Sequence, residues 1–234
     1  MTTDSAARPS DADTTTPPSD ATTRAFYDAI AEDYADQFRD GLAARPVDRA
    51  LLSAFAEFVA ADGGGPVADL GCGPGWVTAY LADLGLPVFG LDLSASMVAT
   101  ARRAYPGLRF EQGSMRALDL PDGHLAGVVS YYSSIHTPVA ELPDLFAEFH
   151  RVLAPGGHLL LAFQVGDEPR RLDRPYGHPV ALDFLRRRPE QVAELLSAAG
   201  FTLRTRAVRE PEEAFAETTP HAFLIARKPG PAAP

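Results

Sequence analysis

Cysteine is almost absent from this sequence, because its 234 residues contain a single one, Cys72. One cysteine cannot form an internal disulfide and cannot assemble a thiolate metal site. Its place among glycines favours a role for a small side chain over a role for a reactive thiol. We therefore expect no oxidising compartment and no bound metal.

Long apolar runs are also missing. No stretch reaches the roughly 18 consecutive apolar residues that a membrane-spanning helix needs. Residues 1–24 lack the apolar segment of a secretory signal. From these two features we expect a cytoplasmic protein that does not bind membranes.

Basic residues are few compared with acidic ones. The chain has 21 Lys and Arg against 31 Asp and Glu, for a formal net charge of −10. Binding to a nucleic-acid backbone depends on clustered Lys and Arg, so nucleic acid is not an expected partner. The arginines do cluster between residues 170 and 188, but such a local patch is more often a solvated face.

Large apolar side chains are rare in residues 1–23, which are rich in Thr, Asp, Ser, Ala and Pro. Such a segment cannot bury enough surface to offset its ordering entropy, which predicts a disordered tail. Apolar residues then recur every four positions from Phe26 to Phe38, which predicts an amphipathic helix. A second helical pattern stops at three glycines. We expect residues 24–62 to form N-terminal helices that act as a lid, and residues 63–230 to form the main domain.

Short apolar runs alternate with helical patterns after the glycines, which predicts a parallel sheet with crossover helices. These runs are apolar throughout, as expected for strands covered on both faces. Near the end, "FTLRTRAVRE" and "HAFLIARKP" follow one another without a convincing helix between them, so we expect an antiparallel hairpin to close the sheet. Residues 164–188 are the longest interruption between regular elements and are predicted to form an insertion that contacts a substrate.

The stretch "VADLGCGPGWVTAYLADLG" joins an apolar run to a helical pattern through a glycine-rich turn. Glycine at such a turn lets a ligand lie against free backbone N–H groups at the positive end of a helix dipole. Gly71, Gly73 and Gly75 at alternate positions after Asp69 are more than a tight turn needs. The dinucleotide fingerprint places its third glycine where this chain has Trp76, so a nicotinamide cofactor fits the spacing less well.

Asp69, Gly71, Gly73 and Gly75 form a pattern that resembles the first motif of the class I S-adenosylmethionine-dependent methyltransferases. The resemblance extends from roughly residue 26 to residue 228, with its stronger motifs in the first half. It implies an α/β fold with a doubly wound, Rossmann-like sheet of about seven strands, mostly parallel, and an N-terminal helical lid. It also implies S-adenosylmethionine as the cofactor, with the glycine loop around the amino-acid part.

Further residues are predicted to contact this cofactor. Asp92 ends the next apolar run, where a carboxylate can accept hydrogen bonds from the ribose hydroxyls, while Ser94 caps the following helix. The resemblance implies that Ser114 meets the adenine edge, although many members carry Asp there, and that the backbone of Met115 offers another contact. The predicted cofactor set also includes the neighbours Leu93 and Met97.

The segment "FYDAIAEDY" is similar to a helix that many small-molecule members of the family fold over the cofactor. Tyr27 and Tyr34 would then belong to the lid. The alternative is that both are ordinary half-buried residues of an amphipathic helix.

Methyl transfer is a direct displacement that depends on positioning, and a base matters only if the nucleophile must lose a proton. Ligands of open α/β sheets lie beyond the carboxyl ends of the strands, which points to the segment "SYYSSIHTP". His136 in this segment is the candidate base, or else a structural hydrogen-bonding residue. Tyr131 and Tyr132 either line the same pocket or pack in the core. Tyr176 and His178, in the insertion, either reach the acceptor or lie on the surface.

The sequence is thus interpreted as a methyltransferase for a small-molecule acceptor in bacterial natural-product or antibiotic biosynthesis, methylating O, N or S, as a monomer or homodimer. A nicotinamide-dependent oxidoreductase and a non-catalytic nucleoside-binding protein remain as alternatives, because a fold does not fix a function.

Overall fold

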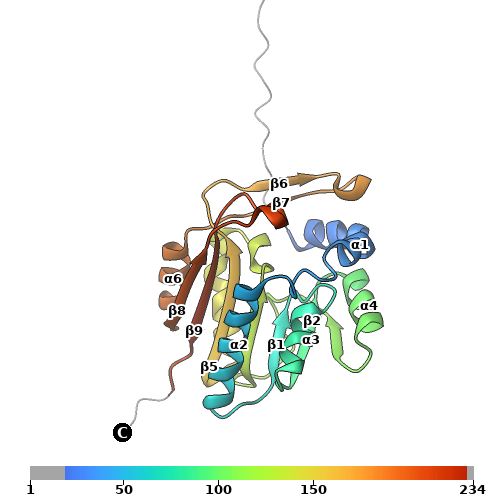
Figure 1. Ribbon diagram of the computed structural model, residues 1–234. Helices are drawn as coiled ribbons and strands as arrows, with labels where there is room; N and C mark the ends of the chain where they lie inside the picture. Colours follow the sequence, from blue (N-terminus) through green and yellow to red (C-terminus); the bar gives the residue numbers. More distant parts are fainter. Residues whose placement is uncertain (1–18, 231–234) are drawn as a thin grey trace, which may run out of the picture.

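A seven-stranded sheet forms the centre of the protein (Figure 1). The computed structural model describes residues 19–230. The strand order is β3-β2-β1-β4-β5-β9-β8. The strands are β1 (Val67–Leu70), β2 (Val88–Asp92), β3 (Arg109–Gln112), β4 (Leu125–Tyr131), β5 (Leu153–Gln164), β8 (Thr202–Arg209) and β9 (His221–Arg227).

The five strands from β1 to β5 run parallel to one another. Strand β9 is antiparallel to both β5 and β8, between which it lies. The predicted fold class, a mostly parallel Rossmann-like α/β sheet closed by an antiparallel C-terminal hairpin, is confirmed.

Helices cover both faces of the sheet (Figure 1). The α-helices are α1 (Asp20–Gln37), α2 (Pro46–Ala61), α3 (Trp76–Asp83), α4 (Ala95–Ala104), α5 (Leu142–Val152) and α6 (Pro189–Ala198); short 3-10 turns are η1 (Ser134–His136), η2 (Val139–Glu141), η3 (Pro175–Gly177) and η4 (Glu213–Phe215). On β5, Leu159 and Leu161 belong to the apolar cluster of α5 and α6, whereas Leu160 belongs to that of α2 and α3. The central strands β1, β5 and β9 are therefore buried on both faces, as predicted, whereas the edge strands β3 and β8 are partly exposed.

Helix α1 begins earlier than the sequence predicts. The disordered tail was expected to reach residue 23, but Ser19 caps a helix that starts at Asp20. The Ser19 side chain accepts a hydrogen bond from the Thr22 backbone N–H, and Thr22 reciprocates, which is a capping box. Apolar periodicity misses this turn because it contains no large apolar residue. The remainder of the predicted tail, residues 1–18, lies outside the described residues.

The insertion at 164–188 is more regular than predicted. It contains an antiparallel pair, β6 (Arg170–Asp173) and β7 (Ala181–Phe184), with η3 between them. Leu182 packs in one apolar cluster with Phe26 and Ile30 of α1. The expectation of an interruption without regular elements was wrong. The sequence contains no signal that residues 170–173 pair with residues 181–184.

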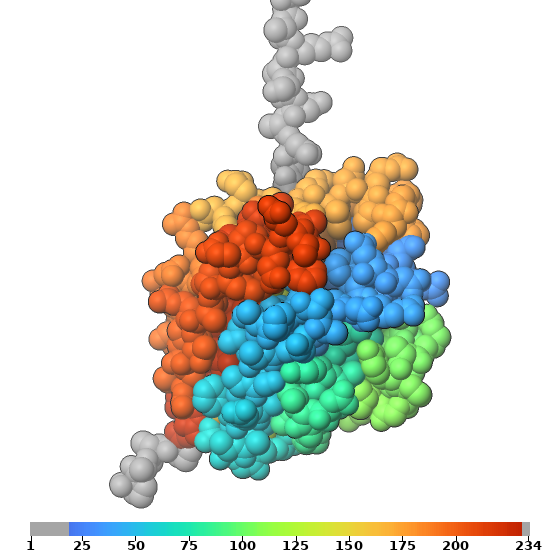
Figure 2. Space-filling view, viewed as in Figure 1, coloured from blue at the N-terminus to red at the C-terminus, as the bar shows by residue number. Residues whose placement is uncertain are grey.

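Only α1 of the two N-terminal helices lies over the carboxyl ends of the strands. Helix α2 buries Leu52, Phe55 and Val59 in the core beside the sheet, so the predicted lid over residues 24–62 is restricted to its first helix. Figure 2 shows the N-terminal segment in blue, the insertion in light orange and the segment around residue 215 in red meeting on one face of the molecule. Three segments that are distant in the sequence thus lie together on one face of the molecule.

Candidate functional site

The glycine loop joins β1 to α3, as expected. Gly71, Gly73 and Gly75 have φ angles of 76°, 52° and 92°, in the region that favours glycine. A Cβ on Gly71 would lie 2.2 Å from Cβ of Ser133, so packing alone explains that glycine. A Cβ on Gly73 would meet no heavy atom within 4 Å. Gly73 therefore leaves open space at the place where a ligand is predicted.

Two buried carboxylates lie beside this loop. Asp69 accepts a hydrogen bond from the Thr78 hydroxyl at 2.6 Å, and burial raises the pKa of Asp69 to about 7. Burial likewise raises the pKa of Asp92 to about 6. The Asp92 oxygens accept bonds from the backbone N–H groups of Gly73 and Ser94, each at 2.8 Å.

Ser94 caps α4, since its hydroxyl accepts a bond from the Met97 backbone N–H. Asp92 therefore does not cap this helix, as predicted, and its carboxylate instead binds the loop and the turn. Each of its oxygens keeps a second lone pair for a ligand hydroxyl.

Two cavities open from this region. The first, named here the loop cavity, has a volume of about 140 Å³. Of the predicted cofactor residues it is lined by Tyr27, Tyr34, Asp69, Gly71, Gly73, Asp92, Leu93, Met97, Ser114 and Met115. Gly75 does not line it; a Cβ there would meet the Phe110 ring at 2.8 Å, so Gly75 serves packing. The structure thus brings together nearly all the residues that the sequence assigned to the cofactor.

The second space, named here the aromatic cavity, has a volume of about 420 Å³. It lies between α1, the insertion and the segment before β9. It shares part of its wall with the loop cavity: Tyr27, Tyr34, Trp76, Val77, Tyr131 and Tyr132 line both. The two cavities are therefore adjacent, with these side chains as their common wall.

Helix α1 is fastened across the loop cavity by two aspartates that sequence reasoning missed. Asp20 accepts a bond from the Ser114 hydroxyl at 2.7 Å and pairs with Arg116. Asp28 accepts bonds from the Ser94 hydroxyl at 2.6 Å and the Ser96 backbone N–H at 3.1 Å. Asp28 follows Tyr27 directly in the quoted "FYDAIAEDY" segment, which was the available signal.

His136 lies in η1, directly after β4, and is 8% exposed. Its Nε2 is 2.9 Å from the Tyr27 hydroxyl. Burial lowers the pKa of His136 to about 3, far from the neutral range that suits a general base. The assignment of His136 as the catalytic base is therefore not supported by its surroundings, which favour a role in holding Tyr27.

Tyr131, the last residue of β4, and Tyr132, the first residue after it, lie at the common wall. The Tyr131 hydroxyl donates to Asp48 at 2.6 Å, and the Tyr132 hydroxyl lies 2.6 Å from Nδ1 of His221. Tyr132 has a φ of 54°, a strained conformation for a residue with a side chain. The turn after β4 thus holds the Tyr132 ring at the boundary between the two cavities.

The insertion contributes one of its two predicted site residues. Tyr176 lines the aromatic cavity and is 43% exposed. His178 lines neither cavity; its Nε2 lies 2.7 Å from a carboxylate oxygen of Asp33 on α1. The expectation that His178 reaches an acceptor was wrong, because it fastens the insertion to α1.

Comparison with known proteins shows what the chain is similar to. Residues 67–157 match the family described as "Methyltransferase domain". A probable S-adenosylmethionine-dependent methyltransferase of Mycolicibacterium smegmatis is 31% identical over 141 residues, which cover 59% of this chain and 52% of that protein. Over these residues the chain is similar to S-adenosylmethionine-dependent methyltransferases. A trans-aconitate 2-methyltransferase of Rhizobium meliloti is 33% identical over 149 residues, 63% of this chain and 53% of that protein.

The solved DhpI–SAH complex superposes on this chain with a TM-score of 0.67 at 24% identity, covering 91% of this chain and 97% of that one. That likeness shows the fold. The chain spans about half the length of the curated relatives it matches. In the described part of the chain, no helix combines the length and apolarity that crossing a membrane requires.

The residues that line the loop cavity suit S-adenosylmethionine, the predicted cofactor. Gly73 leaves room beside the main chain, and α3 starts at Gly75 without a side-chain cap, so N–H groups remain for a ligand carboxylate. Buried Asp69 and Asp92 suit a ligand that carries positive charge and hydroxyl groups.

Cofactor binding is expected to weaken as the pH falls. A cationic ligand favours the ionised forms of Asp69 and Asp92, whose pKa values are raised to about 7 and about 6 by burial. Binding should therefore release protons, and affinity should drop by about tenfold or more between pH 8 and pH 5. Calorimetry in buffers of different ionisation enthalpy measures this proton release. Proton uptake, or a constant affinity across that range, would contradict the linkage.

Proposed function

We propose that this protein transfers a methyl group to a small organic acceptor bound in the aromatic cavity. The observation that carries the proposal is the wall shared by the two cavities, with Tyr27, Tyr34 and Tyr132 among its residues. A volume of about 420 Å³ falls in the range of small-molecule sites. S-adenosylmethionine, when bound, supplies a methyl group on a sulfonium centre that an acceptor can attack.

The residues of this chain are proposed to act mainly by positioning. The glycine loop and Asp92 would hold the donor, and the tyrosines at the common wall would exclude water and orient the acceptor. Holding two reactants in line accounts for several kcal/mol of barrier reduction without covalent catalysis.

Neither of the two histidines that line the cavities in the described part of the chain is placed as a free base. His136 is engaged with Tyr27, and His221 with Tyr132. Burial lowers the pKa of these histidines to about 3 and about 4, respectively. We therefore propose an acceptor that is nucleophilic in its uncharged form, such as an aromatic amine, a ring nitrogen or a sulfur atom.

His136→Ala tests this assignment. Because His136 holds Tyr27 and is not the base, we expect kcat to fall by less than about tenfold and KM for S-adenosylmethionine to rise. Tyr27→Phe removes the same hydrogen bond and should give the same pattern, with the double variant no worse than either single one. A 100-fold loss of kcat in His136→Ala, with Tyr27→Phe near normal, would instead restore His136 as the base.

Mass spectrometry tests the activity itself. The protein is incubated with S-adenosylmethionine and a panel of phenols, amines and thiols, and the products are searched for the mass of an added methyl group. Binding of S-adenosylhomocysteine with no product from any acceptor would favour the non-catalytic alternative. Tighter binding of NAD than of S-adenosylmethionine would favour the oxidoreductase.

A place in bacterial natural-product biosynthesis, in the cytoplasm, remains part of this proposal. The bacterial relatives and the size of the aromatic cavity support it. O, N and S acceptors all remain compatible with the site.

A further inference from the structure

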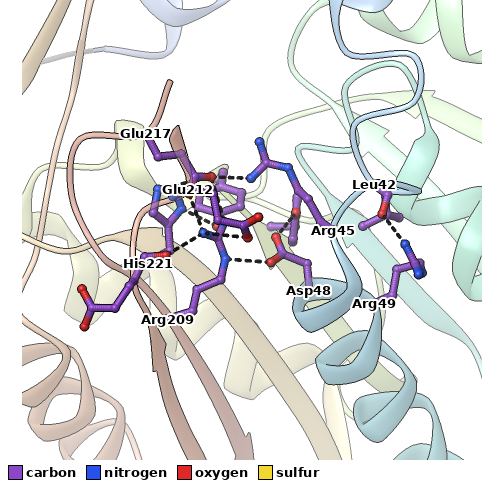
Figure 3. Close-up of polar contacts among 11 residues, drawn as sticks. Leu42, Arg45, Asp48, Arg49, Arg209, Glu212, Glu217 and His221 are labelled. Atoms are coloured by element: carbon purple, nitrogen blue, oxygen red, sulfur yellow. Dashed lines mark hydrogen bonds and ion pairs between the residues drawn. The ribbon is translucent and has the colours of Figure 1, made fainter. Parts of the chain in front are cut away.

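Four charged residues from segments distant in sequence form a cluster beside the aromatic cavity (Figure 3), and two of them, Arg45 and Glu217, line it. Arg209 on β8 donates from Nε to Asp48 on α2 at 2.9 Å. The same guanidinium donates to both carboxylate oxygens of Glu217, at 2.5 and 2.8 Å. Arg45 donates to Glu217 at 2.5 Å. We name this set of Arg45, Asp48, Arg209 and Glu217 the charged quartet.

The quartet is closed and electrically balanced. Its two guanidinium groups face two carboxylates, and the side chains are between 1% and 12% exposed. Burial would raise the pKa of Glu217, but the bonds from Arg209 and Arg45 hold it below its usual range. The quartet therefore adds no net charge to the cavity, even though Arg45 and Glu217 line it.

The neighbour His221 does not change this balance. It faces Tyr132, which follows β4, and the charges of the quartet, and burial, the largest effect, lowers its pKa to about 4. His221 is therefore neutral at pH 7. Among the described residues that line the cavity, only Arg170 is a charged group without an ion pair, and because Arg170 is exposed, water and salt screen its charge.

The rest of the lining is mainly aromatic and aliphatic. Tyr34 stacks on Trp76 with ring centroids 5.7 Å apart, and Phe26 meets Phe184 edge to face. Gln164 also lines the cavity, and its Oε1 is buried without a hydrogen-bond partner in the described residues. Such an atom suits a ligand that donates one hydrogen bond.

From this lining we propose that the acceptor is an uncharged, ring-bearing molecule with a hydroxyl or N–H group that donates to Gln164, and that the balanced quartet excludes polycarboxylates. This proposal rests on the proposed function, since it names the substrate class of the same cavity. Moving a polycarboxylate from water into a cavity whose buried charges are already paired leaves most of its carboxylates without partners. A flat aromatic molecule instead gains ring contacts and buries apolar area.

Two probes test the proposal on the full chain saturated with S-adenosylhomocysteine. Calorimetry compares 2-naphthol, which is uncharged at pH 7, with trans-aconitate, a tricarboxylate. We expect 2-naphthol to bind at least about tenfold more tightly. Equal or tighter binding of trans-aconitate, or no binding of 2-naphthol, would overturn the proposal. Failure to bind S-adenosylhomocysteine would instead overturn the proposed function, so the two outcomes are distinguishable.

Glu217→Gln provides the matched test of the charge balance. It leaves the quartet with one excess positive charge, so affinity for trans-aconitate should rise by about tenfold while that for 2-naphthol changes less. Glu190→Gln is the control, because this substitution makes the same charge change in an exposed ion pair with Arg206. It should leave the affinities for both probes unaltered. An equal response of the two variants would contradict the role of the quartet. The comparison of probes on the unaltered protein stands even if Glu217→Gln fails to fold.

Discussion

Gly73→Ala is expected to lower the affinity for S-adenosylmethionine by about 100-fold or more, because the added methyl group would occupy the space that the ligand needs. The folded protein itself has room for it, since no heavy atom lies within 4 Å of the new Cβ. The backbone φ of 52° should cost only about 1 kcal/mol of folding free energy for a residue with a side chain. Calorimetric titration and a denaturant midpoint measure the two effects separately.

Gly85→Ala is the matched control for this prediction. Gly85 also has a positive φ, 87°, and open space around its Cβ position, but it lies after α3 and lines neither cavity. The two variants should lose similar stability, and only Gly73→Ala should lose cofactor affinity. A Gly73→Ala protein with unchanged affinity would show that the cofactor does not lie against this part of the loop.

Asp48→Ala is expected to destabilise the protein by about 3–5 kcal/mol, the range for removing one partner of a buried ion pair. Asp48 is fully buried, and its loss would leave Arg209 Nε and the Tyr131 hydroxyl without their acceptor. Chemical denaturation measures the difference in unfolding free energy. The common wall should also change its shape, because Tyr131 lines both cavities and would lose the acceptor of its hydroxyl group.

Asp36→Ala serves as the control. Asp36 pairs with Arg39 on the surface, with both side chains more than 70% exposed, so this substitution should change stability by less than about 0.5 kcal/mol. If Asp48→Ala costs as little as Asp36→Ala, then the quartet does not hold α2 to the C-terminal strands.

Features that depend on neighbours in the chain could be predicted from the sequence. Continuous apolar runs predicted the buried strands, because a strand that is covered on both faces has apolar side chains at successive positions and no alternation with polar ones. The glycine spacing located the loop, and Ser94 was assigned correctly as the cap of α4. The C-terminal hairpin followed from two adjacent strand patterns without a helix between them.

Features that depend on distant pairing could not be predicted. Arg209 and Asp48 are 161 positions apart, and Tyr27 and His136 are 109 apart. A single sequence contains no signal for such pairs, because either side chain alone resembles an ordinary surface or core residue. His136 was assigned as a base from its position after β4, whereas its chemistry follows from burial and from Tyr27.

The attachment of α1 at both sides of the loop cavity has a kinetic consequence. Asp20 binds Ser114 and Arg116, Asp28 binds the start of α4, and His178 ties the insertion to the same helix. A cofactor beneath this helix can exchange with solvent by that route only when several of these contacts open together. Residence time is then governed by the frequency of this opening, so spent S-adenosylhomocysteine should leave slowly and turnover should be sensitive to viscosity and to product inhibition.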